Sequence, residues 1–209
     1  MDNCCEDKAC ELEELRAKQS KVLWIVLGIN AAMFGIELGA GWLAGSLALQ
    51  ADSLDMLGDT TVYAFTLFAI AKSDRWRSPA VLLKGGIMAF FALWVLAQGI
   101  VRLLNPHVPG VELMSTTGLL ALAANGYCLF LLTRHKSDDL NMRSTWLCSR
   151  NDIIANIGVL VAAGGVLLTG TMLPDLLVSL LITAVFLQSA WAVLSSALAE
   201  RRLATPKFP

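Results

Sequence analysis

Apolar residues form six long runs, separated by short segments of polar or small residues. The runs cover about residues 22–43, 47–71, 79–104, 112–133, 145–169 and 172–199. Each has the length of roughly 20 or more helical residues that a bilayer core of about 30 Å requires. Backbone groups in lipid need partners within the protein, and the runs are too long for barrel strands. The pattern therefore predicts an all-α polytopic membrane protein, a bundle of six transmembrane helices.

The segments between the runs are too short to be domains. We expect three parts: a polar tail over residues 1–21, a membrane domain over 22–199 and a short tail over 200–209. After Ala199 only ten residues remain, so the sequence predicts no soluble C-terminal domain. Two small-residue spacings, Gly35 with Gly39 and Gly41 with Gly45, indicate close helix packing.

Composition agrees with a membrane protein. Hydrophobic residues make up 56% of the chain and charged residues 16%, with a mean hydropathy of +0.63. Soluble domains have about 25% charged residues. The net charge of -1 gives no reason to expect a nucleic-acid partner. The first 21 residues carry six acidic and four basic groups, which excludes a signal peptide at the start.

The distribution of Lys and Arg predicts the orientation. With a cytoplasmic N-terminus, 13 of the 16 basic residues lie in inside segments and only Arg102 lies outside; Lys84 and Arg150 fall within runs. The positive-inside rule therefore predicts that both termini are cytoplasmic, which agrees with an even number of spans.

Ionisable groups inside the apolar runs are the candidate functional residues, because a charge in a span costs roughly 2.5 to 3.5 kcal/mol. Asp55 and Asp59 in the second run are four residues apart and share a helix face. Cys148 and Asp152 repeat this spacing in the fifth run. Facing each other, the pairs would supply four ligands for a tetrahedral divalent ion. A sulfur ligand favours Zn²⁺ or Cd²⁺ over Mg²⁺ or Ca²⁺.

Several alternatives stay open at these positions. Asp52, nearest the outer end of its run, is either solvated, a helix cap or a secondary metal ligand. Cys148 alone would be read as a small buried hydrophobe. Cys148 and Asp152 also lie near the start of the fifth run, so either that helix starts earlier, near Leu140, or the site lies nearer the cytoplasm.

Weaker candidates line a path for the ion or bond between helices. They are Glu37, Asn30, Asn125, Asn151 and Asn156. The tail cysteines Cys4, Cys5 and Cys10 should stay reduced in the cytoplasm, where they either collect a thiophilic ion or are inert. Cys128 is expected in the core, and His107 in an outer loop.

Two segments resemble the cation diffusion facilitator family. GSLALQADSLDMLGD resembles its second transmembrane helix and LCSRNDIIANIGVL its fifth. In this resemblance Asp55, Asp59 and Asp152 match the metal-binding positions, and Cys148 stands where His is usual. The thiol shifts the expected preference toward softer ions such as Cd²⁺.

The resemblance implies export of Zn²⁺ or a similar ion across the cell (inner) membrane in exchange for H⁺, by a homodimer with six helices and cytoplasmic termini. The family's usual cytoplasmic C-terminal domain is not expected here. We do not expect an enzyme, because the sequence has neither HExxH nor a nucleophile motif. The alternatives are a carrier of Fe²⁺ or Mn²⁺ and a membrane-anchored metal-binding or sensing protein.

Overall fold

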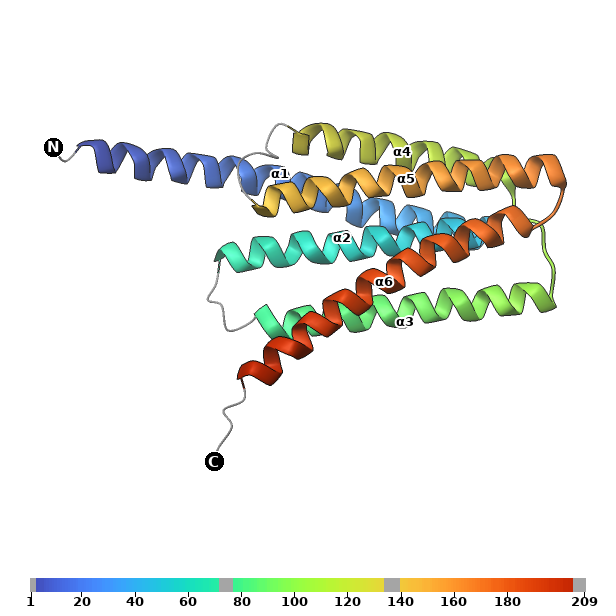
Figure 1. The fold of residues 1–209 in the computed structure, drawn as a ribbon. Coiled ribbons are helices and arrows are strands. Elements are labelled where there is room, and N and C mark those ends of the chain that lie inside the picture. Colours follow the sequence, from blue (N-terminus) through green and yellow to red (C-terminus); the bar gives the residue numbers. More distant parts are fainter. Residues whose placement is uncertain (1–2, 72–76, 134–139, 205–209) are drawn as a thin grey trace, which may run out of the picture.

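Within the residues that the structure describes, the protein is a bundle of six long α-helices (Figure 1). The computed structural model describes the backbone of residues 3–71, 77–133 and 140–204, and side chains within 20–64, 86–133 and 149–195 with short gaps. The helices are α1 (Asn3–Ala44), α2 (Leu47–Ala71), α3 (Arg77–Leu104), α4 (Val111–Thr133), α5 (Leu140–Thr169) and α6 (Leu173–Ala204). The described residues contain no strand, so the predicted all-helical fold is confirmed.

Two helix boundaries differ from the apolar pattern. The fifth helix begins at Leu140, which agrees with the earlier start that was one of the two alternatives left open by the sequence. Helix α1 begins at Asn3, so the predicted polar tail is helical from residue 3 and runs directly into the first span. Residues 3–27 contain neither Gly nor Pro and are rich in Glu, Leu, Lys and Ala, which favour helix even where the chain is polar.

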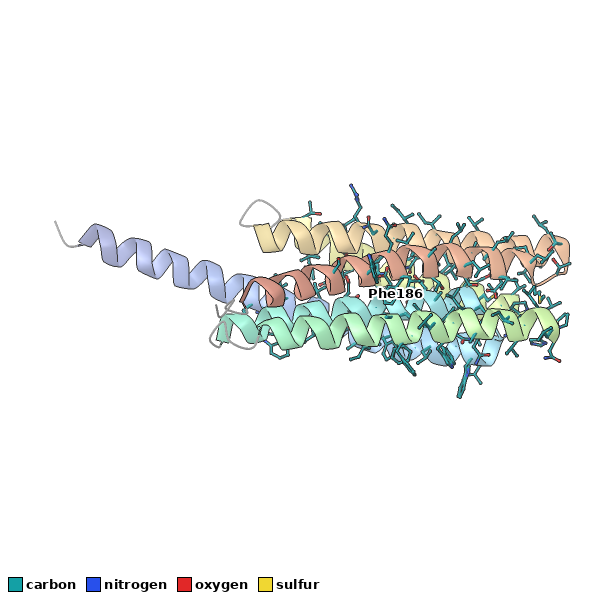
Figure 2. The ribbon with its side chains drawn as sticks, turned by 60° about the horizontal axis from the view of Figure 1, so that its bottom comes forward. Phe186 is labelled. Carbon is teal, nitrogen blue, oxygen red and sulfur yellow. The ribbon has the colours of Figure 1, made fainter. Side chains whose placement is uncertain are left out.

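Four helices surround the interior of the bundle, and α3 and α6 lie beside them. Helix α1 packs against α2 and α4, α4 packs against α5, and α2 packs against α5. Helix α6 crosses obliquely in front of α2 and packs against α3 (Figure 1). Phe186 of α6 fills the junction between α2 and α3, where it joins a cluster with Ala51, Leu54, Ala92 and Val95 (Figure 2).

The distribution of polarity is that of a membrane protein. Large apolar side chains point outward, among them Leu43, 84% exposed, and Leu168, 87% exposed. Acidic and amide side chains are buried between the helices instead. Among described residues, Ser20–Ala44, Val111–Thr133 and Ser149–Thr169 are long and apolar enough to cross a bilayer, and Ala89–Leu104 and Leu173–Gln188 are shorter apolar helices. An apolar exterior around a polar interior suits lipid as the surrounding solvent.

The turn between α1 and α2 depends on one glycine and one close helix contact. Gly45 has a positive φ of 65°, and the backbone N–H of Ser46 donates to the Gly41 carbonyl oxygen at 2.8 Å. A Cβ on Gly41 would lie 3.0 Å from the Gln50 backbone nitrogen and 3.1 Å from the Leu49 Cβ. The predicted close packing therefore holds at Gly41, whereas a Cβ on Gly35 or Gly39 would meet nothing within 4 Å.

A buried aspartate on α6 holds the start of α2. The Ser46 hydroxyl donates to Asp175 Oδ1 at 2.6 Å, and the backbone N–H groups of Leu47 and Ala48 donate to Oδ2 at 2.8 Å and Oδ1 at 3.1 Å. Ser46 Oγ also accepts the N–H of Leu49 at 3.1 Å, as a helix N-cap does. Asp175 thus satisfies donors at the N-terminus of α2 that have no partner within the helix. This contact fixes the helix that carries Asp52, Asp55 and Asp59.

Asp175→Ala should destabilise the protein by about 1–3 kcal/mol, because it leaves three buried donors without an acceptor. Asp175→Asn keeps one acceptor oxygen and should cost less. Unfolding in detergent micelles, followed by circular dichroism, would test this order. Equal stability of both variants and wild type would contradict the role given to Asp175.

Gly41→Ala should lower the stability of the bundle, because the added Cβ would force α1 away from the backbone of α2. Gly39→Ala is the matched control, since a Cβ there enters open space and alanine favours helix by up to about 1 kcal/mol. The same unfolding experiment applies. A Gly41 variant as stable as the Gly39 variant would contradict the packing described here.

Candidate functional site

The predicted acidic pair of α2 meets α5 in the interior of the bundle. The carboxyl groups of Asp55 and Asp152 share a hydrogen bond, and Asp59 lies close enough to Asp152 for their charges to interact. Asp152 is 2% exposed and Asp59 6% exposed. A hydrogen bond between two carboxyl groups needs a proton on one of them. Asp55 and Asp59, two of the four predicted ligands, thus lie within range of the charge of a third, Asp152.

Helical spacing explains why these side chains converge. Asp55 and Asp59 are four residues apart, so they stack on the face of α2 that packs against α5. Arg150 lies two residues before Asp152 on α5, and Arg150 is exposed whereas Asp152 is buried. The two residues point to different sides of α5, as a spacing of two requires.

Cys148 lies on α5 one helical turn before Asp152. Its side chain falls outside the described residues, so its part in the site stays a prediction. Among the side chains that are described, no group of three or more His, Cys, Asp or Glu residues is arranged to hold a metal ion. The tetrahedral set of four ligands therefore stays a prediction.

A second pair of carboxyl groups lies beside the first. Glu37 of α1 and Asp52 of α2 are both 0% exposed, and none of their four carboxyl oxygens has a hydrogen-bond partner among the described residues. Their charges interact with each other and with Asp55. The acidic interior therefore extends from α5 across α2 to α1.

Comparison with known proteins identifies the family. The cation efflux transmembrane domain matches residues 23–200. The chain belongs to the cation efflux family. The match covers all six apolar runs, and the resemblance seen in the second and fifth runs is thereby confirmed.

Curated relatives in this family are metal transporters by name. The chain is 29% identical over 200 residues to zinc transporter ZitB of Yersinia pestis, covering 87% of this chain and 62% of that protein. It is 28% identical over 192 residues to ZitB of Escherichia coli, covering 85% and 61%. It is 27% identical over 190 residues to the metal cation efflux system protein CzcD of Cupriavidus metallidurans, covering 84% and 60%. The chain thus spans about three fifths of the length of these relatives.

The buried amides of this cation efflux protein differ from expectation. Hydrogen bonds between helices were one expected role, but Asn30 Nδ2 donates to the Val26 carbonyl oxygen and Asn156 Nδ2 to the Asp152 carbonyl oxygen, each within its own helix. The Oδ1 atoms of Asn30 and Asn156, and both amide atoms of Asn125, have no partner among the described residues. Amides with unused oxygens in the interior favour the other expected role, which is to line a path.

The remaining predicted residues divide into three groups. Asn151 is exposed on α5, and its place on the path stays a prediction. Cys128 is buried against Leu23, Val26 and Leu132, as expected for a core residue, and His107 is exposed in the loop before α4. The side chains of Cys4, Cys5 and Cys10 lie outside the described residues, so their metal role stays a prediction.

Sequence reasoning missed Asp175. The available signal was an acidic residue three positions into a helix that follows a short turn, which usually indicates a charge placed at its own helix terminus. Asp175 instead caps a different helix, α2, from 127 to 129 residues away in the chain. A contact across that separation leaves no pattern in a single sequence.

Proposed function

We propose that this protein exports divalent metal ions, Zn²⁺ and Cd²⁺ above all, in exchange for protons. One observation carries the proposal: the charges of Asp55 and Asp59 on α2 interact with that of Asp152 on α5, and Asp55 and Asp152 share a hydrogen bond. Such a site binds either protons or a cation, because the same oxygen atoms serve both. Relatives named as zinc transporters and a metal cation efflux protein support this choice of substrate.

The exchange follows from ligand chemistry. A metal ion from the cytoplasm binds deprotonated Asp55, Asp59, Cys148 and Asp152, and the protons that these groups carried are released. The helices then rearrange so that the site opens to the outer side. There, protons bind the carboxyl and thiol groups again and displace the ion. The empty, protonated carrier returns, so each cycle moves metal outward and protons inward.

The orientation of this carrier rests on the charge count. We infer six spans in the inner membrane with both termini cytoplasmic, because 13 of 16 basic residues then lie on the cytoplasmic side. On this orientation the turn between α1 and α2 faces outward. The proposed carrier acts as a homodimer. Its cytoplasmic part includes residues 1–21, whose three cysteines are candidates to collect the ion.

Asp59→Asn and Asp152→Asn should each abolish metal transport, with a loss larger than the about 10- to 100-fold that follows removal of a ligand's hydrogen-bond partner. The assay is uptake into proteoliposomes that contain a zinc-sensitive dye and a pH dye, with Zn²⁺, Cd²⁺, Fe²⁺ and Mn²⁺ compared. Glu112→Gln is the matched control, because Glu112 is an exposed acid in the first turn of α4.

Metal entry with opposite proton flow, lost in the two variants and kept in the control, is the expected result. Full transport by either variant would refute the site. Binding of metal without any transport by wild type would instead favour a membrane-anchored metal-binding protein. Faster transport of Fe²⁺ or Mn²⁺ than of Zn²⁺ would overturn the proposed substrate.

Cys148→His should change the ion preference rather than abolish transport. Imidazole binds Zn²⁺ well, whereas thiolate favours softer ions. We expect the ratio of Cd²⁺ to Zn²⁺ transport to fall by about tenfold, within the range that ligand-shell changes produce. Cys128→Ser is the control, since Cys128 is buried in the core cluster of α1 and α4. An unchanged ratio would exclude Cys148 from the site.

A further inference from the structure

We propose that Glu37 and Asp52 form a second cation site, an all-oxygen exit station through which the metal ion leaves the site of Asp55, Asp59, Cys148 and Asp152. This inference rests on the proposed transport function. It concerns a different part of the interior, between α1 and α2, and a different ligand chemistry.

The four carboxyl oxygens of Glu37 and Asp52 differ from those of Asp175 in their hydrogen bonding. Glu37 Oε1 and Oε2 and Asp52 Oδ1 and Oδ2 are buried and lack any hydrogen-bond partner in the described part of the chain. Buried carboxylates elsewhere in proteins are paired, hydrogen-bonded or bound to a metal. Asp175, also a buried carboxylate of this bundle, accepts three hydrogen bonds. The contrast leaves a proton or a cation to compensate the charges of Glu37 and Asp52.

Glu37 and Asp52 also lie between Asp55 and the α1–α2 turn. Asp52 is three residues before Asp55, so it lies about 4.5 Å nearer the α1–α2 turn at a rise of 1.5 Å per residue. Glu37 lies seven residues before the end of α1 and Asp52 five residues after the start of α2, and the two helices run antiparallel. The two side chains are therefore at nearly the same level. Their charges interact with each other, and both also interact with Asp55. An ion that moves from Asp55 toward the turn meets this pair next.

The proposed transport site and the pair of Glu37 and Asp52 differ in the softness of their ligands. In the proposed transport site the thiol of Cys148 would hold Zn²⁺ and Cd²⁺ strongly, whereas Glu37 and Asp52 offer only carboxylate oxygen. Two carboxylates are fewer than the three or four protein ligands of tight zinc sites, so water would complete the shell. The outer site should accordingly bind a soft ion more weakly than the inner one. A step from strong to weak ligands favours release to the outer side.

The test is ¹¹³Cd NMR of the purified full chain in detergent micelles, with Cys4, Cys5 and Cys10 changed to Ser so that the tail gives no sulfur signal. Cadmium bound to sulfur resonates downfield of cadmium bound only to oxygen. Wild type in this background should give two protein-bound resonances, one of each kind. Glu37→Gln with Asp52→Asn should remove only the oxygen-type resonance, and Cys148→Ser should move only the other.

Matched variants keep the test decisive. Glu112→Gln removes one exposed acid near the same end of the bundle and should leave both resonances in place. The single variants Glu37→Gln and Asp52→Asn, checked for helical content, decide the result if the double variant does not fold. Each should lose the oxygen-type resonance, because each leaves only one carboxylate.

Three results would overturn the exit station. One is a wild-type spectrum with only the sulfur-shifted resonance, which leaves the proposed transport site intact. Another is an oxygen-type resonance that survives in both single variants. The third is an unchanged spectrum combined with an altered pH dependence of transport, which would make the pair a proton carrier instead. A wild-type spectrum without the sulfur-shifted resonance would instead count against the proposed function.

Discussion

Burial of carboxyl groups in a bundle that faces lipid is the constraint on which this structure depends. A carboxylate inside the bundle is costly unless a proton, a hydrogen-bond donor or a cation compensates its charge. The protein uses two of these solutions in the described residues. Asp175 accepts three hydrogen bonds from the start of α2, and Asp55 shares a hydrogen bond with Asp152. Glu37 and Asp52 receive neither kind of bond from the described residues.

Asp175 and the acids of the proposed metal site differ in how their charge is compensated. Asp175 is satisfied by the protein, so its charge serves to fix α2 against α6. In the proposed carrier, Asp55, Asp59 and Asp152 bind either protons or a metal ion, so the compensation of their charge can be exchanged. Asp175 fixes one end of α2, and the proposed ligands Asp55 and Asp59 lie further along the same helix. This fixed end matters, because ligands bind selectively only when the helix that carries them has a defined position.

The polarity of the interior also bears on how an ion would move. The unused oxygens of Asn30, Asn125 and Asn156 lie within the same four helices as the acidic groups, and apolar side chains cover the outside. A polar interior with spare acceptors suits an ion that exchanges its water for protein ligands in steps. Thiol and carboxylate ligands on α5 and α2, followed by carboxylates alone between α1 and α2, would order those steps by decreasing affinity for a soft ion.

The sequence by itself determined the helical bundle, its six elements and the candidate ligands on α2 and α5, because hydropathy sets spans in lipid and a spacing of four residues sets a common helix face. It left open whether the fifth helix starts earlier or the site lies nearer the cytoplasm, and in the structure α5 begins at Leu140. Only the tertiary structure decided which polar groups meet. Three contacts join residues on different helices: Asp175 caps α2, Asp55 shares a hydrogen bond with Asp152, and Glu37 lies beside Asp52. Such contacts depend on how the helices pack, and packing between distant segments has no periodic signature in one chain.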